Sequence, residues 1–120
     1  MKYMLMIYED QAPYASASQE EQGALFQRYM TFTGDLQKEG KMRAGDALQP
    51  SFKATTVRLK DGKRISTDGP YAESKEQLGG YYIVDVKDID EATAIAERIC
   101  RLHTWNHAIL EVRPVMVLDF

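Results

Sequence analysis

Cysteines, basic charge and long hydrophobic runs are all scarce in this chain of 120 residues, which has one Cys, 15 Lys and Arg, and 18 Asp and Glu. The lone Cys100 excludes an internal disulfide framework and predicts a cytoplasmic protein. A formal charge of −3 argues against the broad basic surface of a nucleic-acid-binding protein. The longest uncharged apolar opening, residues 3–8, is far shorter than the roughly 18 residues that suggest a membrane span, and it does not resemble a signal peptide.

The first half of the chain predicts a strand, a loop and a helix. Residues 2–8 form a short apolar run rich in strand formers, and residues 9–18 are expected to be a loop broken by Pro13. Ser18 followed by Glu21 is a capping box that predicts the start of a helix, and Gly40 marks its end. Apolar residues at helical spacing predict the buried face of this helix: Leu25, Tyr29, Phe32 and Leu36.

The second half predicts four more strands and one more helix. Residues 42–48 are extended, and residues 54–59 and 63–68 form a hairpin, for which we predict a three-residue loop that sets Val57 opposite Ile65. Residues 78–86 are the most strand-like stretch, and Asp88 opens a second helix. The final strand is expected at residues 109–118, with Pro114 indicating an edge position. The buried face of the second helix is predicted to hold Ala92, Ile95, Ala96, Ile99 and Leu102.

This order of elements predicts one domain, residues 1–120, of the α+β class. The arrangement expected is a ferredoxin-like split βαβ fold with an added β-hairpin and both helices on one face of an antiparallel sheet. The strands at residues 3–8 and 81–84 are apolar on both faces, so the face that the helices leave open needs a second partner. The sequence therefore predicts a homodimer whose sheets pack face to face.

The segment around residues 66–80 is the first candidate site. Asp68 stands at the end of a strand, and Gly69 and Pro70 form a rigid turn that could present its carboxylate to a cleft for general acid or base chemistry. The alternative is that Asp68 only satisfies the amides of its own turn. Gly79 and Gly80 indicate a bulge, or close approach by a ligand or another backbone.

Other polar residues extend this candidate site. Strand ends and loops are where a dimer of sheets leaves clefts, so Tyr8, Asp46, Asp68 and Glu73 are expected to converge there. His103 and His107 stand four residues apart, but the sequence around them indicates a helix end and a loop, so no metal site is predicted. No spacing matches a nucleotide- or cofactor-binding fingerprint, and Cys100 is interpreted as a half-buried thiol.

The chain also resembles a known family over essentially its whole length. The residues that carry the resemblance are KYMLMIYED at 2–10, GDALQP at 45–50, TTVRLKDGK at 55–63, TDGPYAESKEQLGGYYIVDV at 67–86 and EVRPV at 111–115. They resemble the YCII-related, DGPF-domain proteins, with Tyr71 in place of the phenylalanine of the family's naming motif.

The resemblance implies a ferredoxin-like fold assembled into a dimeric α/β barrel, and it implies no established reaction. In the wider family a histidine on the first helix and an acidic residue have been proposed as an active-site pair, and Tyr29 occupies the position that we align with that histidine. Association with sigma factors is also implied.

Two hypotheses about function follow. The first is an enzyme that acts on an unknown small molecule, without a cofactor, with Asp68 as general acid or base and Glu73 and Tyr29 as positioning groups. Tyr8, Asp46, Gly69, Pro70, Gly79 and Gly80 would then bind the ligand. The second is a non-catalytic module that senses a ligand or partners a sigma factor.

Overall fold

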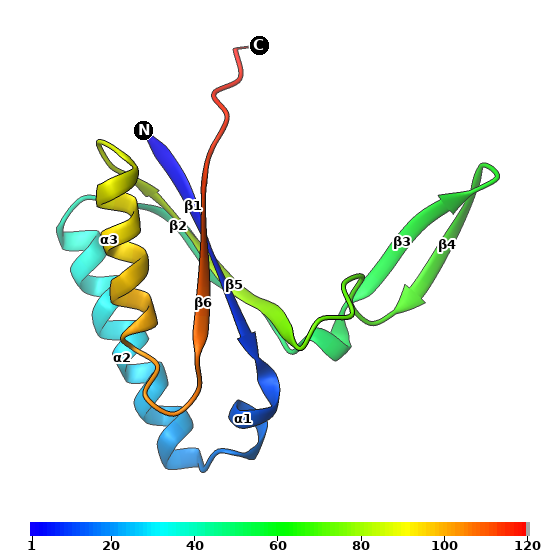
Figure 1. Ribbon diagram of the computed structural model, residues 1–120, viewed down its shortest axis with the longest axis horizontal. Helices are drawn as coiled ribbons and strands as arrows, with labels where there is room; N and C mark the ends of the chain where they lie inside the picture. Colours follow the sequence, from blue (N-terminus) through cyan, green and yellow to red (C-terminus); the bar gives the residue numbers. More distant parts are fainter. Residues whose placement is uncertain (120) are drawn as a thin grey trace.

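The computed structural model describes residues 1–119 and shows a helix-covered sheet from which a hairpin projects (Figure 1). The sheet contains β1 (Lys2–Asp10), β2 (Met42–Ala47), β5 (Glu76–Asp85) and β6 (Ala108–Pro114). The helices are α1 (Gln11–Ser16), α2 (Gln19–Lys38) and α3 (Ile89–Cys100). A single 3-10 turn, η1 (Ser51–Lys53), leads into the hairpin of β3 (Thr55–Lys60) and β4 (Lys63–Asp68).

The four-stranded sheet interleaves two β-α-β units. Its order is β2-β5-β1-β6, and each neighbouring pair is antiparallel. The unit β1-α2-β2 is therefore split by β5, and the unit β5-α3-β6 is split by β1. This mixed architecture confirms the predicted α+β class. Pro114 ends β6, which lies at the edge of the sheet as its position predicts.

Both long helices begin where the sequence predicts, and α2 also ends there. The second helix, α3, ends at Cys100, so Leu102, which was predicted to lie on its buried face, belongs to the turn that follows. Ser18 accepts a hydrogen bond from the Glu21 amide at 3.1 Å, and the Asp88 carboxylate accepts one from the Glu91 amide at 2.9 Å. Gly40, just beyond α2, has a φ of 72°, which favours glycine. The residues that the helices bury are Leu25, Phe32 and Leu36 on α2, and Ala92, Ile95, Ala96 and Ile99 on α3.

Three local predictions are wrong. Residues 11–16 of the expected loop form α1, because the Asp10 carboxylate accepts a hydrogen bond from the Ala12 amide and caps a helical turn. The hairpin has a two-residue turn, Asp61–Gly62, with φ of 52° and 76°. The final strand ends at Pro114 instead of residue 118, because β1 begins at Lys2, whose carbonyl accepts the Val115 amide and leaves no strand beyond it to pair with.

The hairpin has a two-residue turn because its two strands are exposed to solvent. Both faces of β4 are exposed, and so is most of β3, so burial does not reward placing Val57 opposite Ile65. The Asp-Gly pair adopts left-handed backbone readily and matches the twist of two-residue hairpins. The observed register therefore sets Leu59 opposite Arg64 and Val57 opposite Ser66.

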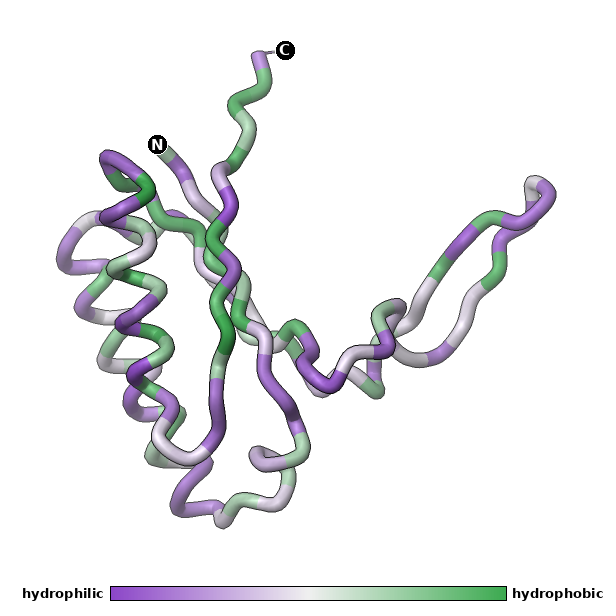
Figure 2. Tube along the Cα trace, in the orientation of Figure 1, coloured by the Kyte–Doolittle hydropathy of each residue, from purple (hydrophilic) through white to green (hydrophobic). Residues whose placement is uncertain are grey.

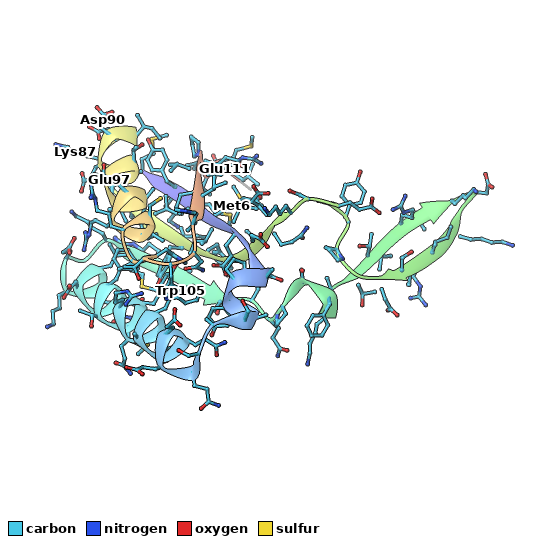
Figure 3. The ribbon with its side chains drawn as sticks, turned by 60° about the horizontal axis from the view of Figure 1, so that its bottom comes forward. Met6, Lys87, Asp90, Glu97, Trp105 and Glu111 are labelled. Carbon is cyan, nitrogen blue, oxygen red and sulfur yellow. The ribbon has the colours of Figure 1, made fainter. Side chains whose placement is uncertain are left out.

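The core lies between the sheet and the two long helices. Tyr3, Leu5 and Ile7 alternate along β1 toward the helices and are buried, Leu5 completely. The intervening Met4 and Met6 are only half-buried, and because side chains alternate along a strand they point to the opposite face of the sheet. Figure 1 shows α2 and α3 together on one side of the sheet. Met6 lies opposite Glu111 of β6, and the two are close together in Figure 3.

The start of β5 has a bulge opposite β1 and lies unusually close to the backbone of β2. Ile7 of β1 pairs with Gly80 and Tyr8 pairs with Leu78, so Gly79 has no partner on β1. A Cβ on Gly80 would lie 2.9 Å from the Asp46 carbonyl oxygen, which is backbone and cannot swing away. A bulge and a close backbone approach, the structural alternatives that the glycine pair indicated, are thus both present.

Gly80→Ala is expected to lower the free energy of unfolding by about 1–3 kcal/mol, because two backbones must separate to admit the methyl group. Gly23→Ala is the matched control, since a Cβ at Gly23 of α2 has nothing within 4 Å and the change removes a poor helix former. That control should raise stability by up to about 1 kcal/mol. Urea unfolding of both variants checks the pair, and equal stability of the two would contradict this account of the Gly80 contact.

Candidate functional site

A cavity of about 830 Å³ opens on the helix side of the sheet, among α1, α2, β2 and the start of β5. Leu25, Phe26 and Met30 of α2 give it an apolar wall. Glu9 and Tyr29 lie at its polar end. No Lys or Arg from the described part of the chain lines it. The carboxylates in its described lining are those of Glu9 and Asp46.

A chain of hydrogen bonds runs from this cavity into the protein. The Tyr29 hydroxyl lies 2.5 Å from His103 Nε2, and His103 Nδ1 lies 3.0 Å from Asn106 Oδ1. Asn106 Nδ2 donates to Glu9 Oε2 at 3.1 Å. The His103 side chain is 2% exposed and Asn106 is 3% exposed, whereas Tyr29 reaches the cavity. Glu9 also lines the cavity, so this series of hydrogen bonds both starts and ends there, at Tyr29 and at Glu9.

Three separate parts of the fold hold these four residues. Tyr29 belongs to the apolar stripe of α2, and Glu9 lies near the end of β1, where it pairs with Ala108 of β6. His103 and Asn106 lie in the loop between α3 and β6. Arg28 Nε fixes this loop against α2 by donating to the Leu102 carbonyl at 2.7 Å.

The same loop is also anchored to the first short helix. Trp105 stacks on Tyr14 of α1, with ring centroids 6.1 Å apart, and is labelled in Figure 3. Tyr14 itself lines the cavity. The loop and α1 therefore close the same end of the cavity.

Burial disfavours the charged forms of Tyr29, Glu9 and His103 in this series of hydrogen bonds. It raises the pKa of Tyr29, with a smaller contribution from the nearby Glu9 carboxylate, and it raises the pKa of Glu9 itself. Burial also lowers the pKa of His103; the Asn106 hydrogen bond acts against this and the Arg28 charge adds to it. At neutral pH both Tyr29 and His103 are therefore uncharged.

The structure brings some of the predicted site residues to the cavity. Tyr29, Asp46, Gly79 and Gly80 all line it, and Asp46 Oδ2 accepts a hydrogen bond from the Tyr81 hydroxyl at 2.7 Å. Tyr8 does not line it.

The residues of the Asp-Gly-Pro turn lie elsewhere. Asp68 and Glu73 are exposed near the base of the projecting hairpin, and Gly69 and Pro70 lie between them. The Gly69 amide donates to the Ala54 carbonyl at 2.7 Å and so closes the hairpin base. Within one chain, the turn therefore does not meet Tyr29, and the roles predicted for its residues remain predictions.

The two histidines do not form a pair. His103 is held by Tyr29 and Asn106, whereas His107 is exposed. Across residues 1–119, no cluster of three or more His, Cys, Asp or Glu side chains is arranged to hold a metal ion. The described helices are all too short or too polar to cross a membrane. Cys100 is half-buried, and its Sγ donates to the Ala108 carbonyl at 3.7 Å.

Comparison with known proteins places the chain in a family. A family model for the YCII-related domain matches residues 1–119. The chain belongs to the YCII-related family. It is 31% identical over 115 residues to an uncharacterised protein of Rhizobium meliloti (strain 1021), and the alignment covers 96% of this chain and 92% of that relative. The resemblance seen in the sequence is thereby confirmed.

Sequence reasoning did not find three residues of the hydrogen-bonded chain in this YCII-related protein. The sequence places Glu9 in the expected loop of residues 9–18 and His103 at a helix end, and it assigns no role to Asn106. One signal was available: Asn106 is the only asparagine among the 120 residues, and it lies beside the only tryptophan. Nothing in the sequence, however, shows that residues 9, 29 and 103–106 meet.

Proposed function

We propose that this YCII-related domain binds a neutral, mainly apolar small molecule with one polar end. The observation that supports this is the cavity itself, whose apolar wall faces a polar end and whose described lining has two carboxylates, Glu9 and Asp46, but no cation. A carboxylate or phosphate ligand would meet like charges there without compensation. A neutral ligand would bury apolar area and accept or donate a hydrogen bond at Tyr29.

We also propose that the functional unit is a homodimer in the form of an α/β barrel. Two surfaces support this: the open sheet face that includes Met4 and Met6, and the projecting hairpin, where Val57 is 60% and Leu59 is 74% exposed. Figure 2 shows hydrophobic residues interspersed along this hairpin. A two-stranded hairpin alone is marginally stable in water, so a covering surface would stabilise it.

The distribution of charge along the chain supports a second copy of the protein as the surface that covers the hairpin. Residues 51–68 contain five Lys and Arg against two Asp, a formal charge of +3, so the remainder of the −3 chain carries −6. A basic arm of one chain thus complements the acidic body of another. Asp68 and Glu73 can act at the cavity, as the enzyme hypothesis requires, only if the arm of one chain reaches the body of its partner.

The binding proposal predicts selectivity for uncharged ligands. The probe 4-phenylbutan-2-one should bind saturably, and at least about tenfold more tightly than 4-phenylbutanoate, because tenfold needs only about 1.4 kcal/mol of charge repulsion. Calorimetric titration measures both affinities.

Substitutions can test whether the ketone binds in this cavity. Met30→Trp fills the cavity and should weaken ketone binding about tenfold or more, whereas Met116→Trp, at a residue that is 77% exposed and outside the cavity lining, should not. Equal binding of the two probes, or ketone binding that survives Met30→Trp, would contradict the proposed site. Binding without any chemical change would favour the ligand-sensing alternative over the enzyme.

A further inference from the structure

We propose that Tyr29, His103, Asn106 and Glu9 form a proton relay, and that the domain uses it to isomerise a neutral carbonyl compound by moving a proton. The proposal rests on the proposed function, because it assigns a reaction to the same cavity. In this scheme Tyr29 is the group that touches the substrate. His103 takes the proton through Tyr29, while Asn106 and Glu9 are positioning residues.

The direction of the hydrogen bonds follows from the Asn106 amide. Its Nδ2 faces the Glu9 carboxylate, which can only accept, so its Oδ1 must face His103. His103 Nδ1 therefore carries the proton that bonds to Asn106. In a neutral imidazole the other nitrogen, Nε2, then has a free lone pair, and it accepts the Tyr29 hydroxyl. Every donor in the series therefore points in the direction from Tyr29 to Glu9.

This polarity makes the Tyr29 oxygen a proton acceptor for a bound molecule. As a substrate α-carbon gives its proton to the Tyr29 oxygen, the original Tyr29 proton passes to His103 Nε2, and the C–H electron pair remains on the substrate as an enolate. Reversing the two transfers delivers a proton to a different atom of the substrate and restores the neutral relay. The net reaction is an isomerisation, so it consumes no oxidant, reductant or co-reactant.

The surroundings of His103 suit the transient positive charge. Glu9 of β1 lies 3.9 Å from Nδ1 and would compensate the imidazolium. The other titratable or charged groups around Tyr29 and His103 are Arg28 of α2, Tyr82 of β5 and Cys100 of α3. Burial, with a smaller contribution from Arg28, lowers the pKa of His103 and so keeps the resting histidine neutral, as a base must be.

A purely structural network would need no opening to a cavity. Tyr29, Glu9 and His103 line the cavity, although the His103 side chain is only 2% exposed, and Asn106 lies outside the lining. No buried side-chain nitrogen or oxygen among the described residues is left without a partner, so the relay is complete at rest. Both of its ends, the Tyr29 hydroxyl and the Glu9 carboxylate, line the cavity.

The resting state of the relay can be tested by nitrogen NMR of the imidazole rings. The chain has two histidines, so His107→Gln leaves a single ring to assign. We expect His103 to be the neutral tautomer with the proton on Nδ1 at pH 7, in both the wild type and His107→Gln. A proton on Nε2, or a charged ring at this pH, would overturn the relay.

Proton transfer is tested by hydrogen exchange of 4-phenylbutan-2-one. In D₂O the wild type should speed exchange of its α-protons above the buffer rate, and Tyr29→Phe and His103→Gln should each lower that enzymatic rate about 100-fold or more. His107→Gln, at the exposed histidine, should keep the wild-type rate. Asn106→Asp should raise the pKa of His103 and move the acid limb of the pH–rate profile to higher pH, which a merely structural residue would not do.

Two outcomes separate this proposal from the one on which it rests. If the ketone binds saturably but its protons exchange at the buffer rate, the relay is overturned and small-molecule binding stands. If exchange is as fast in Tyr29→Phe as in the wild type, the relay is overturned as well. If the ketone does not bind at all, both proposals fail together.

Discussion

Asn106→Ala is expected to lower the free energy of unfolding by about 3 kcal/mol at pH 7. The substitution removes both the acceptor of His103 Nδ1 and the donor to Glu9 Oε2, and it leaves a carboxylate without a partner in a half-buried position. An unsatisfied buried polar group costs about 1–3 kcal/mol, and more when it is charged. Denaturant unfolding monitored by circular dichroism measures the change.

The companion variant for this prediction removes the charge. When Glu9→Gln is added to Asn106→Ala, the double variant should recover roughly 1 kcal/mol, because a neutral amide tolerates the vacated site better than a carboxylate does. In the wild-type background the same change should destabilise, since it weakens the bond that Asn106 donates. A loss below about 1 kcal/mol for Asn106→Ala would show that the network contributes little to stability.

The double substitution Val57→Glu and Leu59→Glu is expected to dissociate the proposed dimer, raising its Kd about 100-fold or more. Each aliphatic side chain contributes about 1.5–3 kcal/mol when it is buried, and 100-fold corresponds to about 2.7 kcal/mol. Both side chains are exposed in the single chain, so the variant should retain the secondary structure and folding of each subunit. Analytical ultracentrifugation over a concentration series gives the Kd.

The matched control for the dimer is Val117→Glu. This residue is 92% exposed and lies in the tail beyond β6, away from the hairpin, and the substitution should leave the dimer intact. A wild-type protein that sediments as a monomer at all concentrations would contradict the homodimer. A dimer that the double substitution leaves unchanged would contradict the role of the hairpin.

Local signals in the sequence were sufficient to predict most of the fold. Ser18 and Asp88 cap the two long helices because a side-chain oxygen and the amide three residues later are enough to define a helix start. The glycine pair at Gly79 and Gly80 indicated the bulge by lacking side chains in an otherwise apolar strand. These predictions succeed because each depends on a few neighbouring residues.

The predictions that failed depended on something outside their own segment. The three-residue hairpin loop was predicted by pairing apolar side chains on one face, yet an exposed hairpin has no buried face. The preference of Asp61–Gly62 for left-handed backbone therefore determines the turn. The end of β6 depends on where β1 begins.

The same limit applies to the hydrogen-bonded chain. Glu9 and Asn106 are 97 residues apart in sequence, and no local rule connects them. The sequence predicts Asp68 as a site residue because the Asp-Gly-Pro turn is visible in it. The pKa shifts of Glu9 and His103, by contrast, arise only through burial in the folded chain. A candidate site assembled from distant segments therefore needs coordinates, even when each segment is predicted correctly.

The hydrogen bond between the end of β2 and the bulge of β5 affects how this architecture can diversify in evolution. The Leu48 amide donates to the Gly79 carbonyl at 2.9 Å, so the two ends of the segment that carries the hairpin are fastened together at the sheet. The hairpin itself, residues 55–68, is closed at its base by the Gly69 amide on the Ala54 carbonyl, so it can grow, shrink or be exchanged without altering the register of the four-stranded sheet. The hairpin is thus an evolutionary module, which can change its surface while the residues that line the cavity stay in place.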